Sequence, residues 1–421
     1  MEAIIVGGGI AGLTLALALH QAGISARLYE AVHDPAPLGL GINLQPAAVR
    51  ELTELGLGAE LAKTGVEVQR LSYFNKLGQL ICHEKRGLAA GYRWRQYAIH
   101  RGLLQALLMR AARERIGDDN VRCGLRLVSF DQSREKVIAL FRDSRSGEPF
   151  DDTADILVGA DGIHSTVRYL LHPGEAEPRF AQQVLWRAAA YANPFLDGAT
   201  VAIAGHFHQR AIAYPIGGTS MSGQRLTNWI CQIAVADTER RREDWNSRVD
   251  KAKVLQAFRD WRFPWLDIPA LVEQSADIFE FPLIDRDPVD VWTHGRVTLV
   301  GDAAHPMQPI GSQAASQAIV DARVLAAALT EISRPGEALL RYDADRRPVM
   351  NEITVRNRHF GPEGFLQLVE ERAPNGFVRI ADVISRDELD TISSSFLAAA
   401  RFDPATVNAS YSQSDAGQQN R

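Results

Sequence analysis

The sequence predicts an α/β fold in which a nucleotide-binding domain is interleaved with a second domain on a mixed β-sheet, followed by C-terminal helices. Three observations lead to this prediction. Residues 3–30 read as strand, glycine turn, helix and strand. Two later strands, at 154–158 and 296–300, each end in a turn that contains Gly and Asp, and the stretch 174–276 between them holds short β-like runs. A chain of 421 residues can form two or three domains with separate cores.

The opening stretch carries the pattern GxGxxG at residues 7–12. Gly7 allows a tight turn, Gly9 lets the backbone approach a pyrophosphate, and Gly12 lets the helix pack closely on the strands. Free N–H groups and the dipole at the helix N-terminus favour such an anion. Glu30, at the end of the second strand, stands where a carboxylate bonds the ribose hydroxyls. An ordinary βαβ turn explains neither the third glycine nor Glu30, so we predict a Rossmann-like dinucleotide-binding domain.

The composition of the chain excludes several classes of protein. The chain has 46 basic and 51 acidic residues, a net charge of −5 that suggests no nucleic-acid partner. Its cysteines, Cys82, Cys123 and Cys231, are widely spaced, which favours reduced thiols over disulfides or a zinc site. The first strand begins within three residues of Met1, so no signal peptide is expected, and the apolar runs are too short to span a membrane. We therefore expect a cytoplasmic protein without a membrane span.

Between the glycine-rich turns, the sequence predicts a succession of loops, helices and short strands. The Pro- and Gly-rich stretch 35–46 is expected to be a loop, and a helix at 46–55 ends at Gly56. Residues 69–101 form short strands, and Arg101 then opens a helix, either as a solvated charge or as a ligand-binding residue. The strand at 154–158 runs into Asp161 and Gly162, and the strand at 296–300 runs into Gly301, Asp302 and a helix at 312–332. Such strand ends are places where a ligand meets the backbone.

Within the second domain, residues 209–216 and 226–235 are the clearest strands. In the latter strand Trp229 and Gln232 point to opposite faces. One face is expected to be buried and the other to roof a pocket, although any single aromatic residue here also suits a plain core role.

These patterns divide the chain into interleaved parts. We assign 1–75, 98–173 and 277–345 to the nucleotide-binding domain, 76–97 and 174–276 to the substrate domain, and 346–400 to a C-terminal helical region. Helices are expected at 336–359 and within 365–400, and residues 401–421 are expected to be a disordered tail.

Three ordered motifs carry a family resemblance: GGGIAG at 7–12, GADGIHSTVR at 159–168 and GDAAHPMQP at 301–309. Together with YDADRRP at 342–348, they resemble the single-component flavin-dependent aromatic hydroxylases, the group that includes para-hydroxybenzoate hydroxylase. The resemblance covers roughly residues 1–350. The runs LGLGINLQPAAV (38–49), YAIHRG (97–102) and FPLIDRDP (281–288) look most like the phenazine hydroxylases that act on 5-methylphenazine-1-carboxylate.

The resemblance implies FAD as the cofactor. It places Asp302 on the ribityl chain, Arg101 along the ribityl and diphosphate, and Pro309 and Gly311 against the isoalloxazine, with the helix from Ser312 pointing its N-terminus at the flavin. Motif and resemblance together assign the following residues to FAD: Gly7, Gly9, Ala11, Gly12, Glu30, Gly41, Arg101, Asp161, Gly162, Gly301, Asp302, Pro309, Gly311, Ser312 and Ala314.

Ala314 departs from the family, which often has a glycine near this point. Alanine in a left-handed conformation costs roughly 1–2 kcal/mol. We therefore expect Ala314 to lie in the first turn of the helix with a right-handed backbone.

The activity implied is a monooxygenase: NADH or NADPH reduces FAD, and a hydroperoxide at flavin C4a transfers oxygen to an aromatic or heteroaromatic small molecule. No second GxGxxG is present, so the nicotinamide nucleotide is expected to dock transiently. His305 is expected to be structural, and no metal site is predicted. The candidates for the substrate pocket are Met307, Pro309, Tyr214, Trp229 and Gln232, with only one of Trp229 and Gln232 expected to face it.

Alternatives stay open at this point. A related flavoenzyme, a halogenase or a reductase, is one, although the halogenase motif WxWxIP is absent. A non-catalytic protein that holds a hydrophobic ligand on the same fold, like the GDP-dissociation-inhibitor relatives, is another, and the ribityl-binding Asp302 argues against it. A monomer and a homodimer are equally compatible with the sequence.

Overall fold

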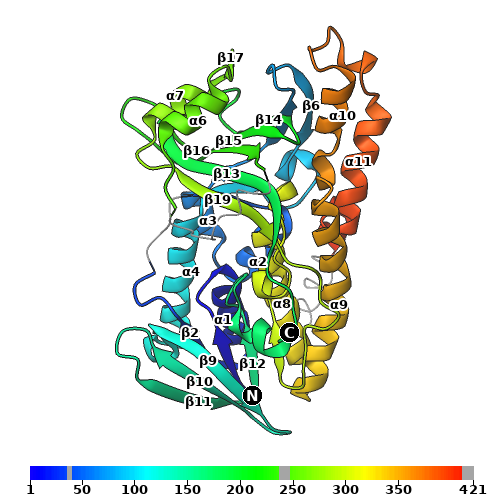
Figure 1. Cartoon of the computed structure of the whole chain (residues 1–421). Helices are drawn as coiled ribbons and strands as arrows, with labels where there is room; N and C mark the ends of the chain where they lie inside the picture. Colours follow the sequence, from blue (N-terminus) through cyan, green and yellow to red (C-terminus); the bar gives the residue numbers. More distant parts are fainter. Residues whose placement is uncertain (36–39, 237–246, 410–421) are drawn as a thin grey trace.

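Two large sheets organise the computed structural model, which describes residues 1–35, 40–236 and 247–409. Figure 1 shows the sheet of the N-terminal strands below and the second large sheet above, with long C-terminal helices along one side of both. The loop residues 36–39 and the end of the predicted tail, 410–421, lie outside the described residues.

The lower sheet is parallel and confirms the predicted nucleotide-binding core. Its strand order is β20-β12-β1-β2-β8, with every pair parallel. The strands are β1 (Glu2–Val6), β2 (Ser25–Glu30), β8 (Val121–Cys123), β12 (Ile156–Gly159) and β20 (Val297–Leu299). Helix α1 (Ile10–Gln21) is buried from Ile10 to Leu19 because it also packs on α4 (Arg101–Ile116) and α8 (Ala314–Glu331). A helix covered on several sides has to be apolar around its circumference.

A three-stranded antiparallel sheet follows α4 and was not predicted. It consists of β9 (Leu125–Gln132), β10 (Val137–Asp143) and β11 (Pro149–Ala154) in the order β11-β10-β9. The predicted strand at 154–158 is in fact the last residue of β11 and the first three residues of β12, separated at Asp155. Only Asp155 separates the two strands, and one polar residue in a strand-like run gives no clear sign of a boundary.

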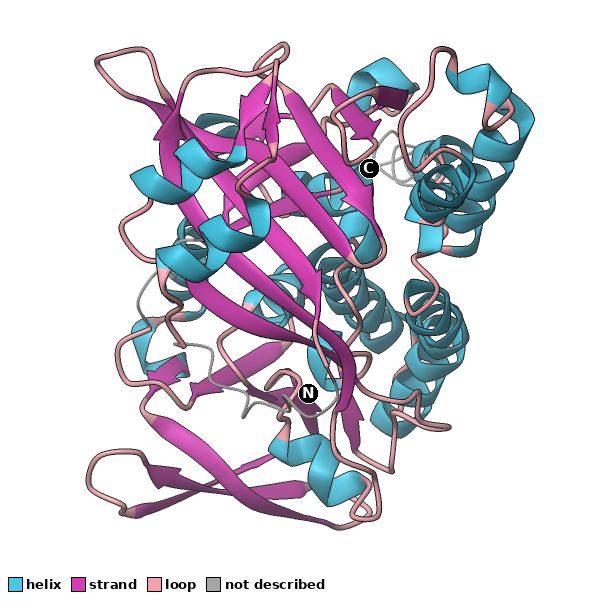
Figure 2. Cartoon of the chain, turned by 45° about the horizontal axis from the view of Figure 1, so that its top comes forward, coloured by secondary structure: helices cyan, strands magenta, loops and turns pink. Residues whose placement is uncertain are grey.

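The upper sheet is mixed and contains seven strands in the order β19-β13-β16-β15-β14-β5-β6. All neighbours pair antiparallel except β14 and β5. The strands are β5 (Arg70–Phe74), β6 (Leu80–Lys85), β13 (Arg179–Ala192), β14 (Thr200–His206), β15 (Gln209–Thr219), β16 (Arg225–Ala234) and β19 (Phe279–Asp285). Figure 2 shows these long strands crossing the molecule. Because β5 and β19 belong to this sheet, the predicted boundaries at 75 and 277 cut the chain on the wrong side of these two strands.

One face of the upper sheet is a closed core. Trp186, Trp229 and Cys231 pack there against helices α6 (Lys251–Phe258) and α7 (Ile268–Gln274) and the short hairpin β17 (Arg262–Phe263) and β18 (Leu266–Asp267). The opposite face looks toward the parallel domain and the C-terminal helices. That second face is the one available to a ligand.

Smaller elements join the two domains. A three-stranded sheet, β3-β7-β4, is formed by β3 (Gly41–Leu44), β4 (Val66–Glu67) and β7 (Tyr97–His100). Helices α2 (Pro46–Glu54), α3 (Gly58–Thr64) and α5 (Thr166–Leu171) lie between the strands in sequence, and α2 and α4 begin where the sequence predicts.

The C-terminal region forms α9 (Pro335–Asn357), α10 (Phe365–Arg372) and α11 (Arg386–Ala399), as expected. The predicted disorder from residue 401 is wrong for residues 401–409. Residues 404–409 are helical, and Phe402 and Val407 are only 4% and 2% exposed. Two buried apolar side chains suffice to anchor this segment, and the hydroxyl of Tyr92 donates to the carbonyl of Phe402 at 2.6 Å. Two such residues are too few to show as a periodic pattern.

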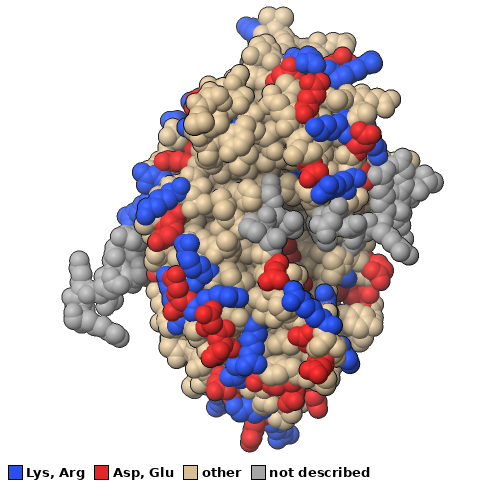
Figure 3. Space-filling model, turned by 90° about the vertical axis from the view of Figure 1, so that its left-hand side faces the viewer, with Lys and Arg blue, Asp and Glu red and all other residues tan. Residues whose placement is uncertain are grey.

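On the face shown in Figure 3, Lys and Arg side chains are interspersed with Asp and Glu. No helix in the described part of the chain is long and apolar enough to cross a bilayer. The three cysteines are free thiols.

Candidate functional site

The glycine turn after β1 has the geometry that the sequence predicts. Gly7 has φ +113°, and an added Cβ would lie 2.4 Å from the carbonyl oxygen of Ala160. A Cβ on Gly12 would lie 2.0 Å from the oxygen of Gly7. A Cβ on Gly9 would meet nothing within 4 Å, and no side chain caps α1. The turn therefore leaves free N–H groups beside open space at a helix N-terminus, which is a ready anion site.

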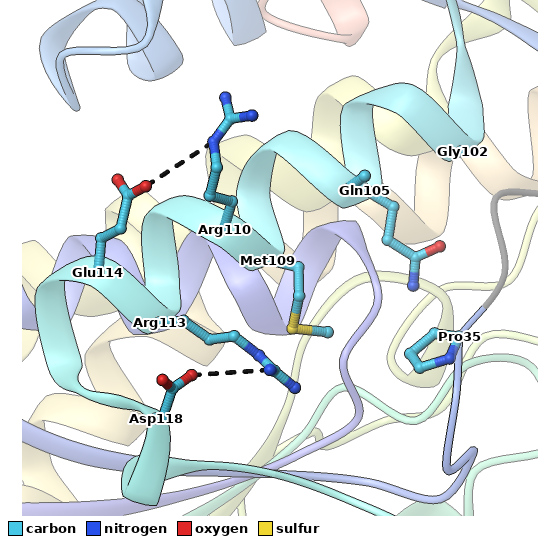
Figure 4. Close-up of a pocket in the computed structure, with 9 residues that line it drawn as sticks. Pro35, Gly102, Gln105, Met109, Arg110, Arg113, Glu114 and Asp118 are labelled. Carbon is cyan, nitrogen blue, oxygen red and sulfur yellow. Dashed lines mark ion pairs between the residues drawn. The ribbon is translucent and has the colours of Figure 1, made fainter.

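Glu30 holds this turn in place. Its carboxylate accepts hydrogen bonds from the amides of Gly8 at 2.6 Å and Val32 at 2.7 Å, and the Gln105 amide donates to the Gly8 carbonyl at 2.9 Å. A cavity of about 420 Å³ lies next to the turn, along α4. Figure 4 shows Gln105 and Pro35 at one end of this cavity and the ion pairs of α4 at the other. The ribose-binding role of Glu30 stays a prediction.

At the end of β20, Gly301 turns the chain so that Asp302 is presented next to α1. Gly301 has φ +60°, and a Cβ on it would lie 2.9 Å from that of Ala11. The Asp302 side chain is exposed and accepts no hydrogen bond from the described residues. Even so, the protein around it removes enough water to raise the pKa of Asp302, and the nearby His305 and Arg101 only partly offset this effect.

A buried network lies beneath this turn. His305 Nε2 and Asp321 Oδ2 are 2.5 Å apart, the other Asp321 oxygen accepts from Arg346 Nε at 2.7 Å, and the Gly301 amide donates to Asp321 at 3.1 Å. Burial would raise the pKa of Asp321, but His305 and Arg346 outweigh it and hold that pKa at about 2. No cluster of three or more potential metal ligands occurs in the described ranges. His305 thus helps fix the turn that carries Asp302.

In the second motif, residues 159–168, the polar groups mainly form hydrogen bonds within their own loop. The Asp161 carboxylate accepts from the Ser165 hydroxyl at 2.5 Å and from the amides of Thr166 and Val167, so it caps α5. Burial raises the pKa of Asp161, and these hydrogen bonds oppose the shift. Gly162, with φ +80°, has open space where its Cβ would stand. A direct role of Asp161 toward a cofactor stays a prediction.

One residue of this motif that sequence reasoning did not single out is Arg168. Its guanidinium is 1% exposed and donates to the carbonyls of Ala303 and Ala304 at 3.1 and 2.7 Å. It also pairs with Glu175 at 2.7 Å. Arg168 therefore ties the second motif to the third, although its position in the motif gave no sign of a particular partner.

The loop before α8 contains residues with positive φ, the backbone conformation that a glycine in the family motif would allow. These residues are Gly311 and Ser312, and Ala314 is not among them. Gly311 has φ +66° and Ser312 has φ +53°. Ala314 is the first residue of α8, which confirms the expected right-handed backbone and moves the start of the predicted helix from 312 to 314.

Ala314→Gly is therefore expected to lower the free energy of unfolding by about 0.5–1 kcal/mol, because glycine loses more backbone entropy in a helix. FAD affinity should stay unchanged, since the amide of residue 314 is retained. Thermal unfolding and FAD titration of the same variant measure both quantities. An unchanged melting temperature together with an altered substrate range would contradict this view and show that the methyl group trims the cavity instead.

A second cavity lies between this loop, the open face of the upper sheet and the C-terminal helices. The predicted residues Gly41, Tyr214, Gln232, Pro309, Gly311, Ser312 and Ala314 all line it. Apolar side chains form much of the rest: Leu71, Leu185, Val201, Ile203, Ile212, Ile230, Phe396 and Leu397.

Two pocket candidates do not line this cavity. Trp229 lies on the opposite face of the sheet, where its indole N–H donates to the Ser275 hydroxyl at 2.9 Å inside the closed core. Met307 is 7% exposed and packs in the core of the parallel domain. Trp229 and Gln232 therefore lie on opposite faces of the strand, as the alternation predicts, and only Gln232 lines the cavity. A contact of Gln232 with a substrate stays a prediction.

Three side chains from the upper sheet form hydrogen bonds with the backbone of Gly41 at the start of β3. Its amide donates to Asn228 Oδ1 at 2.7 Å, while its carbonyl accepts from the Tyr214 hydroxyl at 2.8 Å and from Arg187 Nη2 at 2.9 Å. A Cβ on Gly41 would lie 2.6 Å from Ile216. Glycine at position 41 thus has a steric reason, while the predicted contact of Gly41 with FAD stays a prediction. The sequence offered no signal for Asn228 or Arg187, because each is a single polar residue within a strand.

The charges of the cavity do not balance. Arg86 pairs with Glu84 and Arg210 pairs with Glu363. Arg187 also lines the cavity but has no acidic partner among the described residues, and its Nε is buried without a hydrogen bond. Burial lowers the pKa of Arg187, and the nearby Arg101 adds to that effect. Among the described residues, Arg187 is therefore the one cation of the cavity that no acidic side chain neutralises.

The residues present fit FAD at the junction of the two domains. The uncapped helix N-terminus with open space at Gly9 suits a diphosphate, and the unbonded carboxylate of Asp302 suits the hydroxyls of a ribityl chain. The loop at 309–314 lines the cavity beyond them.

Comparison with known proteins supports FAD as the cofactor of this chain. Residues 1–357 match the model of a family described as "FAD binding domain". The phenazine 1,6-dicarboxylic acid hydroxylase PhzS of Lysobacter antibioticus is 44% identical over 362 residues, 85% of this chain and 89% of the relative. The 3-hydroxybenzoate 6-hydroxylase of Klebsiella oxytoca is 32% identical over 371 residues, covering 86% and 88%. The structure of HpxO from Klebsiella pneumoniae with FAD and uric acid superposes with a TM-score of 0.75 at 22% identity, covering 97% of each chain.

Proposed function

The chain belongs to the FAD-binding family of flavoprotein aromatic hydroxylases and monooxygenases, and we propose that its substrate is a fused-ring heteroaromatic carboxylate of the phenazine kind. The single observation that carries the proposal is Arg187, the cavity arginine that has no acidic partner among the described residues. A planar aromatic acid would supply both the apolar surface and the missing negative charge. The 44% identity to a phenazine dicarboxylic acid hydroxylase supports the same substrate class.

FAD supplies the redox chemistry, namely reduction by NADH or NADPH and the activation of O₂. The protein's own residues bind and orient. The N-terminus of α1 would hold the diphosphate, and Asp302 with Arg101 would hold the ribityl chain. The start of α8, which has no side-chain cap, would offer free N–H groups and a positive dipole end to the flavin ring, where they would stabilise negative charge. The apolar walls of the cavity keep water from the reacting atoms, which suits hydroxylation better than a passive binding role.

The proposed substrate class is tested with the purified holoenzyme and a panel of compounds: phenazine-1-carboxylic acid, its amide, phenazine and 3-hydroxybenzoate. NADH and NADPH oxidation are followed for each compound, and products are identified by mass. We expect hydroxylated product from the phenazine acid. Product from 3-hydroxybenzoate and none from any phenazine would overturn the proposal.

Arg187→Met is expected to raise the KM for the acid by roughly 10- to 100-fold, because hydrogen bonds to charged groups contribute about 1.5–3 kcal/mol. The KM for the uncharged amide should change little, which makes the amide the internal control. Arg187→Lys keeps the charge and should restore part of the affinity. An equal loss for acid and amide would show that Arg187 serves only to hold Gly41.

We also propose that the enzyme acts in the cytoplasm, where NADH and NADPH are at hand. Its three free cysteines fit a reducing compartment.

A further inference from the structure

Glu363 connects the C-terminal region to the flavin-facing loop. It closes a short 3₁₀ turn, Gly361–Glu363, between α9 and α10. The side chain is only 5% exposed, and its two carboxylate oxygens have different partners. Oε2 forms an ion pair with Nη1 of Arg210, and Oε1 accepts a hydrogen bond from the amide of Gly311 at 3.1 Å. One carboxylate therefore joins a strand of the upper sheet to the loop before α8.

Arg210 is part of the cavity wall. It comes from β15, is 2% exposed, and lines the cavity together with Glu363 and Gly311. Its Nε donates to Gln232 Oε1 at 2.8 Å, and its guanidinium lies 4.9 Å from the centroid of the Phe360 ring. A ligand that enters the cavity meets the same cation that holds Glu363.

The loop that Glu363 holds needs an external constraint. Gly311 and Ser312 are consecutive residues with positive φ, and a left-handed backbone is unfavourable for serine. The C-terminal region also packs closely on this loop, since a Cβ on Gly311 would lie 3.1 Å from Phe396 and 3.2 Å from Pro362. Within the described chain, Glu363 is the acceptor for the Gly311 amide.

We propose that Glu363 and Arg210 are positioning residues for the flavin. Glu363 fixes the amide of Gly311 and thereby the geometry of the loop at the start of α8, and Arg210 fixes the carboxylate of Glu363. Because the pair is buried, its energy responds strongly to any new charge or contact at Arg210. Occupation of the cavity and the conformation of the flavin-facing loop are thus coupled through one ion pair.

Three variants of the full-length holoenzyme test this role. Glu363→Gln keeps the shape of the side chain and removes its charge, and Arg210→Lys keeps the charge but loses the guanidinium geometry. Glu370→Gln is the matched control, because Glu370 lies in α10 of the same C-terminal region and pairs with Lys76 at 2.5 Å, away from the loop. Amide hydrogen exchange over 309–313, the absorption spectrum of bound FAD and the melting temperature are recorded for each.

In Glu363→Gln the exchange of the 309–313 segment should rise by roughly 10- to 100-fold, as a charge-assisted hydrogen bond is lost. The FAD spectrum should shift in the same variant, and Arg210→Lys should show smaller changes of the same kind. Glu370→Gln should match the parent in exchange and spectrum. Parent-like exchange and spectrum in Glu363→Gln would overturn the proposal. If Glu363→Gln does not fold, Arg210→Lys decides by the same two measurements.

Discussion

Gly9→Ala is expected to raise the dissociation constant of FAD by roughly tenfold or more, because a methyl group in a close contact costs about 1–3 kcal/mol. The FAD-free protein should keep its stability. Gly9 has φ −79° and ψ −175°, which alanine adopts freely, and a Cβ there meets nothing within 4 Å. Alanine is a poorer N-cap than glycine, at a cost of up to about 1 kcal/mol, but it also lowers the entropy of the unfolded chain, which contributes about 0.4–1 kcal/mol in the opposite direction. The net change in the unfolding free energy should therefore be small.

Gly12→Ala provides the contrast. Its Cβ would stand 2.0 Å from a backbone oxygen that cannot move without shifting α1. We expect a loss of stability of about 3 kcal/mol or more, at or beyond the upper end of overpacking effects. Urea unfolding of both FAD-free variants, with FAD titrations for Gly9→Ala, measures the two effects. Equal FAD affinity of Gly9→Ala and the parent would mean that the diphosphate does not approach this turn.

Asp302→Ala is expected to weaken FAD binding by about 1.5–3 kcal/mol, through loss of a charge-assisted hydrogen bond. In the FAD-free protein, by contrast, removal of the Asp302 charge should increase the free energy of unfolding. Although the side chain is exposed, the loss of surrounding water in the folded protein raises the pKa of Asp302 above that of the unfolded chain. A carboxyl of this kind stabilises the fold when protonated and loses that contribution as the pH rises through its folded-state pKa.

Asp302→Asn, which removes only the charge, should therefore make the FAD-free protein more stable than the parent at neutral pH. The difference should shrink as the pH falls toward about 4, the pKa of an unperturbed Asp. Equilibrium unfolding of both proteins across this pH range provides the measurement. FAD retention that survives Asp302→Ala unchanged would disprove the assigned role.

The nucleotide-binding half of the site is readable from sequence because its constraints are local. Gly7 and Gly12 meet backbone within the same turn or the adjacent strand, and Asp302 directly follows a buried strand and Gly301. Gly12 and Asp302 thus lie within a few residues of the groups that make them recognisable. The backbone that Gly7 meets, at Ala160, is distant in sequence, and Gly7 is recognised from its place in the motif. The right-handed start of α8 at Ala314 also follows from local backbone energetics.

The substrate half depends on contacts between distant segments. Glu363 meets Arg210 across 153 positions of sequence, and Asn228 meets Gly41 across 187. A lone charged or amide residue in a strand has no pattern that names its partner. Alternation showed that Trp229 and Gln232 face opposite ways, but only the packing of α6 and α7 decides which face is closed. The same reason explains the misplaced domain boundaries, since the pairing of β5 with β14 is non-local.

The wall that the C-terminal region contributes to the cavity has a consequence for the divergence and engineering of such enzymes. The matched FAD-binding domain ends at residue 357, whereas Pro362, Glu363, Ser393, Phe396 and Leu397 of the wall come after it. An exchange of this terminal segment between homologues would therefore reshape the pocket and leave the dinucleotide-binding residues untouched. Such a chimera must keep one ion pair intact. If the segment with Glu363 is transferred without a residue equivalent to Arg210, its carboxylate is buried without a cation.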